Sequence, residues 1–179
     1  PLSLHDALPI SPSSMAITLQ IVSIVFYTFV AFLCIGLPIA VIPGYVHDQL
    51  GFSAVIAGLA VGSQYLATLF SRPLAGRVAD SIGTKRAIIY GLSGIVISGV
   101  MTLVATLLES LPDLSLTILI IARLFLGVAQ GLIGVGTISW CIGQVGTEHT
   151  GRAISWNGIA SYGAIAIGAP IGRSEERRV

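Results

Sequence analysis

The chain has 179 residues, of which 54% are hydrophobic and only 9% are charged, whereas soluble domains carry about 25% charged residues. Its formal net charge is +1, and no basic tract with interleaved aromatic residues occurs, which excludes a nucleic-acid partner. The two cysteines, Cys34 and Cys141, lack metal-ligand spacing, so neither a disulfide framework nor a metal site is indicated. With a mean hydropathy of +0.93, the composition predicts a membrane protein.

The two ends of the chain differ from the rest. Pro1–Ile10 and Arg173–Val179 resemble the two strands of a sequencing-library adapter read as codons. We interpret 1–10 and 173–179 as assembly scars and exclude them from fold reasoning; the alternative is a genuine polar terminus. On the scar interpretation, residues 11–172 are natural, the natural protein continues beyond Gly172, and Met15 is either its start or an internal methionine.

Long uncharged apolar runs follow one another along the chain. Crossing a hydrocarbon core takes roughly 20 apolar residues in a helix. The runs here are about this length or longer, and they lack the alternation of a barrel strand. We therefore predict an all-α membrane protein, a polytopic helical bundle with helices at about 17–43, 52–71, 87–108, 116–140 and 153–172.

Basic residues predict the orientation, because lysine and arginine in short loops stay on the cytoplasmic side. Five of them lie in the connections after the second and fourth runs: Arg72, Arg77, Lys85, Arg86 and Arg152. The alternate connections hold acids and a histidine instead: His47, Asp48, Glu109 and Asp113. The amino terminus, the charged loop 72–86 and the loop 141–152 are therefore predicted to be cytoplasmic.

Within the first basic loop, residues 76–86 read "GRVADSIGTKR". Gly83 allows a positive-φ turn, and Gly76 would let the end of the second helix approach a neighbour. Asp80 places a carboxylate at the membrane face, suited to a helix amino terminus or an arginine. A positive-inside anchor explains the basic residues of this loop but leaves Asp80 unexplained.

This segment resembles the cytoplasmic signature of the major facilitator superfamily, G-x-x-x-D-R-x-G-R-[KR]-R, between its second and third helices. The matching positions are Gly76, Asp80, Gly83, Lys85 and Arg86. Ser81 and Thr84 stand where the family has two arginines. The resemblance implies a conformational latch between the two halves of a transporter.

Arg123 lies inside the fourth run, where an arginine costs roughly 2.5 kcal/mol or more on insertion scales. With Gly127 and Gly131 it resembles the fourth-helix R-x-x-x-G-x-x-x-G motif of the same superfamily, which implies a role in proton coupling. A structural ion pair and snorkelling to the outer interface are the alternatives. The fifth run resembles the exporter signature only in part, because Ala169 interrupts its Gly-Pro step.

Polar side chains within the runs need partners in lipid. Gln64, Gln130 and Asn157 should therefore face the bundle interior, where bonding to another helix is the leading interpretation for each amide. The alternative is that they line a cavity, for which Tyr65 is also a candidate. Small residues four positions apart predict close helix contacts. These pairs are Gly58 with Gly62, Gly94 with Ser98, and Gly127 with Gly131.

From about Gln20 to Gly172 the chain is similar to the amino-terminal half of YhhS-type members of the superfamily, through stretches such as "GLPIAVIPGYVHDQLGFSA" and "VGTEHTGRAISWNGI". The resemblance implies a secondary transporter of the bacterial inner membrane with a twelve-helix fold, of which this chain holds the first five helices. Its implied partners are membrane lipid, a small-molecule substrate, protons and the absent carboxyl-terminal half.

Proton-coupled export is the leading functional hypothesis, and uptake by the same fold is the first alternative. The spans contain no Walker motif, paired carboxylates or Ser/His/Asp set, which argues against an enzyme or an ATP-driven pump, and no cofactor is indicated. A non-transporting membrane sensor or assembly protein is the alternative from a different class.

Overall fold

The computed structural model describes residues 14–176 of the chain, which form five long α-helices and two short helical turns. The α-helices are α1 (Ser14–Gly44), α2 (Ala54–Ile82), α3 (Thr84–Leu107), α4 (Pro112–Val145) and α5 (Thr150–Glu176). A π-helical turn, η1 (Tyr45–Gln49), follows α1, and a 3-10 turn, η2 (Thr147–His149), precedes α5. Residues 1–10 of the first predicted scar lie outside the described part, as do 177–179 of the second, while the backbone of 173–176 continues α5.

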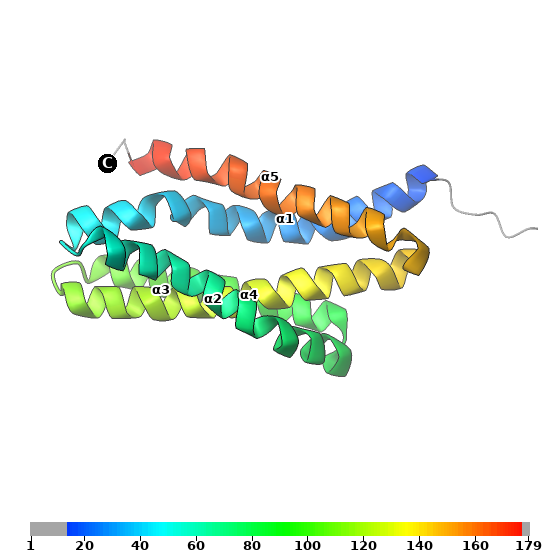
Figure 1. The fold of residues 1–179 in the computed structure, drawn as a ribbon, viewed down its shortest axis with the longest axis horizontal. Helices are drawn as coiled ribbons and strands as arrows, with labels where there is room; N and C mark the ends of the chain where they lie inside the picture. The colour runs from blue at the N-terminus through cyan, green and yellow to red at the C-terminus, as the bar shows by residue number, and fades with distance from the viewer. Residues whose placement is uncertain (1–13, 177–179) are drawn as a thin grey trace, which may run out of the picture.

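The predicted all-α membrane bundle is confirmed for residues 14–176, where no strand occurs. Four helical segments are long and apolar enough to span a membrane: 15–49, 54–82, 84–107 and 112–145. α5 has 27 residues but is not among these four, because polar residues such as Asn157 and Ser161 lower its hydropathy. It nevertheless lies along α1 (Figure 1).

The helices form two layers (Figure 1). α1 and α5 run parallel, side by side, in one layer, while α2 and α3 both pack on α4 in the other, and α1 contacts α4 across the layers. The start of α1, the α2–α3 connection and the α4–α5 connection lie at one end of the bundle, and the other connections lie at the opposite end. Successive crossings of a membrane produce this alternation; which end faces the cytoplasm stays a prediction.

The charged segment 72–86 is not a loop, contrary to our expectation. α2 continues through this segment to Ile82. Gly83, with a φ of +92°, ends the helix, and α3 begins at Thr84. Hydropathy marks the part of a helix that lies in hydrocarbon, but backbone hydrogen bonding continues until a residue interrupts it. The consequence is that Arg72 lies inside α2, ten residues before its end.

Two of the three predicted small-residue pairs lie at helix contacts. A Cβ added at Gly94 would lie 2.8 Å from the Cβ of Ala129 on α4, and Ser98 Oγ donates to the carbonyl oxygen of Ala122 at 2.7 Å. A Cβ at Gly127 would overlap the carbonyl oxygen of Gln64, so α4 also approaches α2 closely. By contrast, a Cβ at Gly58 or at Gly62 would meet no atom within 4 Å in the described part of the chain.

Candidate functional site

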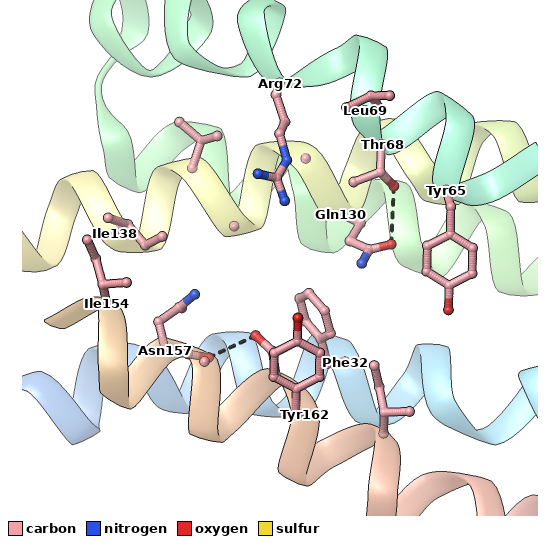
Figure 2. Close-up of a pocket in the computed structure, with 16 residues that line it drawn as sticks. Phe32, Tyr65, Thr68, Leu69, Arg72, Gln130, Ile138, Ile154, Asn157 and Tyr162 are labelled. Atoms are coloured by element: carbon pink, nitrogen blue, oxygen red, sulfur yellow. Dashed lines mark hydrogen bonds between the residues drawn. The ribbon is translucent and has the colours of Figure 1, made fainter. Parts of the chain in front are cut away.

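A cavity of about 590 Å³ opens between α1, α2, α4 and α5 (Figure 2). It is lined by 16 residues: Phe32, Tyr65, Thr68, Leu69, Arg72, Gln130, Gly131, Gly134, Val135, Ile138, Ile154, Asn157, Gly158, Ser161, Tyr162 and Ile165. Each of the four helices therefore contributes a wall. Three of the four residues proposed to line a cavity, Tyr65, Gln130 and Asn157, lie on this one.

Gln64 lies behind the cavity wall instead of on it. It is 0% exposed, and its Nε2 donates to Oε1 of Gln130 at 3.0 Å. Its own Oε1 is buried without a hydrogen-bond partner among residues 14–176. Gln64 thus acts through Gln130, whose amide it orients.

The same wall depends on the close approach of α2 and α4. The hydroxyl of Thr68 lies 2.9 Å from the carbonyl oxygen of Gln64, 3.1 Å from that of Gly127 and 3.3 Å from Oε1 of Gln130. A Cβ at Gly127 would lie 2.6 Å from the Cβ of Ala67. Only a residue without a side chain fits here, so Gly127 makes the polar cluster possible.

Asn157 on α5 is oriented by α1. Thr28, which is fully buried, donates its hydroxyl to Oδ1 of Asn157 at 3.0 Å. The Asn157 amide nitrogen then points into the cavity (Figure 2).

Arg72 is the residue that our sequence reasoning missed. Its guanidinium extends from α2 into the middle of the cavity (Figure 2), opposite α5. Pro73 follows it and cannot donate to the carbonyl of Leu69, another cavity residue, so α2 lacks one backbone hydrogen bond at this point. A helix that begins after the Ser53 cap and ends before Gly83 includes Arg72. Our prediction ended the helix with the apolar run and therefore placed Arg72 in a loop.

None of the five predicted latch residues lines the cavity; they are Gly76, Asp80, Gly83, Lys85 and Arg86. They lie where α2 ends and α3 begins. Asp80 is exposed on the last turns of α2, and Lys85 Nζ lies 5.1 Å from the centroid of the Trp140 ring on α4. A Cβ at Gly76 would meet no atom within 4 Å among the described residues, so the close approach expected there does not occur within this half.

Arg123 also lies away from the cavity, between α4 and α3. It is 2% exposed, and its Nη2 donates to Oγ1 of Thr102 at 2.9 Å. Its Nε and Nη1 atoms are buried and have no hydrogen-bond partner in the described residues. The guanidinium is therefore held inside the bundle by one hydrogen bond, and its Nε and Nη1 atoms remain available to donate to a further group.

Comparison with known proteins identifies the class to which this fold belongs. A model of the Major Facilitator Superfamily matches residues 24–174, and the chain belongs to that family. The resemblance described above is confirmed at this level, while assignment to the YhhS-type group stays a prediction. No solved structure matches the chain.

Bacterial relatives are similar to this chain over most of its length. An uncharacterized MFS-type transporter of Burkholderia pseudomallei (strain 1106a) is 54% identical over 167 residues, which is 93% of this chain and 41% of that protein. A protein of the same description in Pseudomonas aeruginosa (strain LESB58) is 56% identical over 151 residues, 84% of this chain and 38% of that protein. The chain thus spans about two fifths of these relatives.

Proposed function

We propose that this chain is the amino-terminal part of a secondary active transporter that moves a small molecule across the bacterial inner membrane. The observation that carries the proposal is the cavity between α1, α2, α4 and α5, a mainly apolar cavity into which a few polar side chains converge; α1, α2 and α4 are long and apolar enough to span a membrane. Arg72 extends into this cavity from the end of the apolar run of α2, and an ionisable residue that faces a cavity between membrane helices by default marks a solute pathway. Membership of the Major Facilitator Superfamily supports the same function.

The arrangement fits alternating access. In transporters built from two helical halves, the substrate site lies between the halves, and rocking exposes it to each side in turn. Arg72, Gln130 and Asn157 would form this half's contribution, and the facing wall would come from residues outside this chain. Large apolar side chains such as Val55, Phe70 and Leu107 are more than 70% exposed, as a surface covered by lipid and by the second half requires.

The segment that joins α2 to α3 is the proposed latch, on the cytoplasmic side together with the amino terminus. Asp80 is exposed three residues before Gly83, which separates α2 from α3, and a helix end or an arginine of the other half can reach it there. A contact made by this carboxylate in one conformation and lost in the other would bias the equilibrium between them. Lys85, packed over Trp140, would hold the segment against α4.

Proton-coupled export is the mode we propose, with Arg123 as the coupling residue. An arginine stays protonated at physiological pH, so Arg123 would not carry the proton itself. Its two spare buried donors would instead stabilise the ionised form of an acid, or a water, supplied when the whole protein assembles. Protonation of that acid would release the contact and change the conformational balance.

Everted vesicles containing the full-length protein test this function. The vesicle lumen is acidified by respiration, and benzoate, benzamide or benzylamine is added while a dye reports the lumenal pH. Export coupled to protons predicts that at least one solute reduces the lumenal proton concentration by more than the same solute does in vesicles without the protein, where benzylamine can cross as a neutral base. Inward accumulation alone in whole cells would contradict export, and correctly inserted protein with no solute-dependent flux would contradict transport.

A further inference from the structure

The described residues that line the cavity carry positive charge and no negative charge. Of its 16 lining residues, Arg72 alone carries a charge at neutral pH, and no aspartate, glutamate or histidine is among them. Arg72 directly follows the apolar run 52–71, and by the helical rise it lies roughly 15 Å from the carboxyl end of α2. A guanidinium that extends into a cavity between helices is suited to an anionic partner, and no acid is among the described residues that line this cavity.

The amide of Gln130 adds a donor beside the guanidinium. Its Oε1 accepts from Nε2 of Gln64 at 3.0 Å and lies 3.3 Å from the Thr68 hydroxyl. The Thr68 hydroxyl hydrogen is shared with two backbone carbonyls, so Gln64 is the principal donor. With the oxygen held on the protein side, the NH₂ group of Gln130 is directed into the cavity (Figure 2).

The amide of Asn157, on the opposite wall, is also oriented with its nitrogen toward the cavity. The buried hydroxyl of Thr28 occupies its Oδ1 at 3.0 Å, which leaves the Nδ2 hydrogens for the cavity. Two side-chain amides from two layers of the bundle are therefore oriented by buried donors so that each presents hydrogens. Both orientations increase the positive potential around Arg72.

We propose that the cavity binds a soluble organic anion, such as a carboxylate, phosphonate or sulfonate. Arg72 receives the anionic group, since a guanidinium forms paired hydrogen bonds to two oxygens of such a group. Gln130 and Asn157 donate to its remaining oxygens, and Phe32, Tyr65 and Tyr162 contact its organic part. The inference deepens the proposed transport function by naming the substrate class, but the anion site itself depends only on this cavity.

The charge of the cavity is measured on the full-length protein with a reporter cysteine. Gly134 lines the cavity, and a Cβ there would meet no atom within 4 Å in the described chain, so Gly134→Cys fits without strain. Cys34, Cys141 and any cysteine elsewhere in the protein are replaced first. The reaction rates with an anionic sulfonatoethyl and a cationic trimethylammonioethyl methanethiosulfonate are compared in phosphatidylcholine vesicles, each normalised to its rate with a free thiol.

The anionic reagent is expected to be favoured by about tenfold when Arg72 is present. Arg72→Gln removes this preference and Arg72→Lys retains most of it. Arg77→Gln, a matched change on the same helix but outside the cavity, leaves it unchanged. A ratio near one, a preference for the cationic reagent, or a preference that survives Arg72→Gln would overturn the proposal, because the rest of the protein would then neutralise Arg72.

Protection of the reporter cysteine identifies the ligand. Benzoate and phenylphosphonate at millimolar concentration should slow labelling at least threefold through Arg72, whereas benzamide and benzylamine should not. Vesicles with phosphatidylglycerol separate a soluble anion from a lipid headgroup, since protection by that lipid without protection by benzoate or phenylphosphonate would overturn the assignment. Protection by anions without flux in the vesicle assay would contradict the transport function and support the anion site. Flux of benzylamine without protection by anions would support transport and contradict the anion site.

Discussion

Nε2 of Gln64 on α2 donates to Oε1 of Gln130 on α4 at 3.0 Å, directly behind the cavity. Gln64 is fully buried, whereas Gln130 reaches the cavity surface. One hydrogen bond therefore joins two helices and also sets which end of the Gln130 amide a solute meets.

A double-mutant cycle should detect this bond. Gln64→Leu and Gln130→Leu, measured singly and together in the full-length protein, are expected to show a coupling energy of about 0.6–1.7 kcal/mol, the range for hydrogen bonds between membrane helices. The readout is the free energy of unfolding in mixed micelles. The exposed pair Gln20 and Gln144, 3.4 Å apart, is the control and should show almost none. Equal coupling in the two pairs would contradict the structure.

Gly127→Ala should destabilise the protein by about 1–3 kcal/mol, the usual cost of an overpacked contact. The new methyl group would overlap the Gln64 carbonyl and press on Ala67. Gly134→Ala on the same helix is the matched control, because its methyl group would enter open space. Unfolding midpoints of the two variants decide the matter, and a Gly127→Ala protein as stable as the control would refute the close approach of α2 and α4.

The two glycines of the α2–α3 segment should respond differently to alanine. Gly83→Ala is expected to cost about 1–3 kcal/mol, because a φ of +92° with a ψ of 148° is strained for any residue with a Cβ. Gly76→Ala meets no atom within 4 Å in residues 14–176 and should cost little within this half. If Gly76→Ala reduces turnover while stability is unchanged, Gly76 contacts the other half in one conformation only.

Arg123→Met separates a coupling role from a structural one. Two guanidinium nitrogens are buried without partners in the described residues, and replacing a poorly paired buried charge with an apolar side chain is often neutral or stabilising. The variant should therefore unfold at the same temperature or higher, yet lose proton release in the vesicle assay. Marked destabilisation with proton release per solute unchanged would instead assign Arg123 to structure.

Asp80→Asn should slow turnover at least tenfold while insertion and solute binding persist, if the carboxylate is a latch between conformations. The control is Glu109→Gln, an exposed acid at the opposite end of the bundle. Flux in vesicles is measured together with the amount of inserted protein. Normal flux in Asp80→Asn would remove the latch proposal and leave a purely topological role for this segment.

Helix ends and side-chain directions were the parts that sequence reasoning placed poorly. The apolar runs located the helices, but α2 and α4 extend beyond them to Gly83 and Gly146, where positive φ values stop each helix. A four-residue spacing likewise could not distinguish Gly58 and Gly62, which face open space, from Gly127, which faces α2. Spacing defines a face of a helix, but not what lies opposite it.

The amino-acid sequence by itself determined the class of protein, because crossing hydrocarbon imposes a requirement that each segment must meet by its own length and lack of charge. It also identified Tyr65, Gln130 and Asn157, since amides and hydroxyls within such segments need partners. Only the tertiary structure decided that these residues share one cavity with Arg72, while Gln64 and Arg123 do not reach it. The physical reason is that a cavity depends on how each helix is rotated and how closely it approaches the next, and the contacts of all four helices set both.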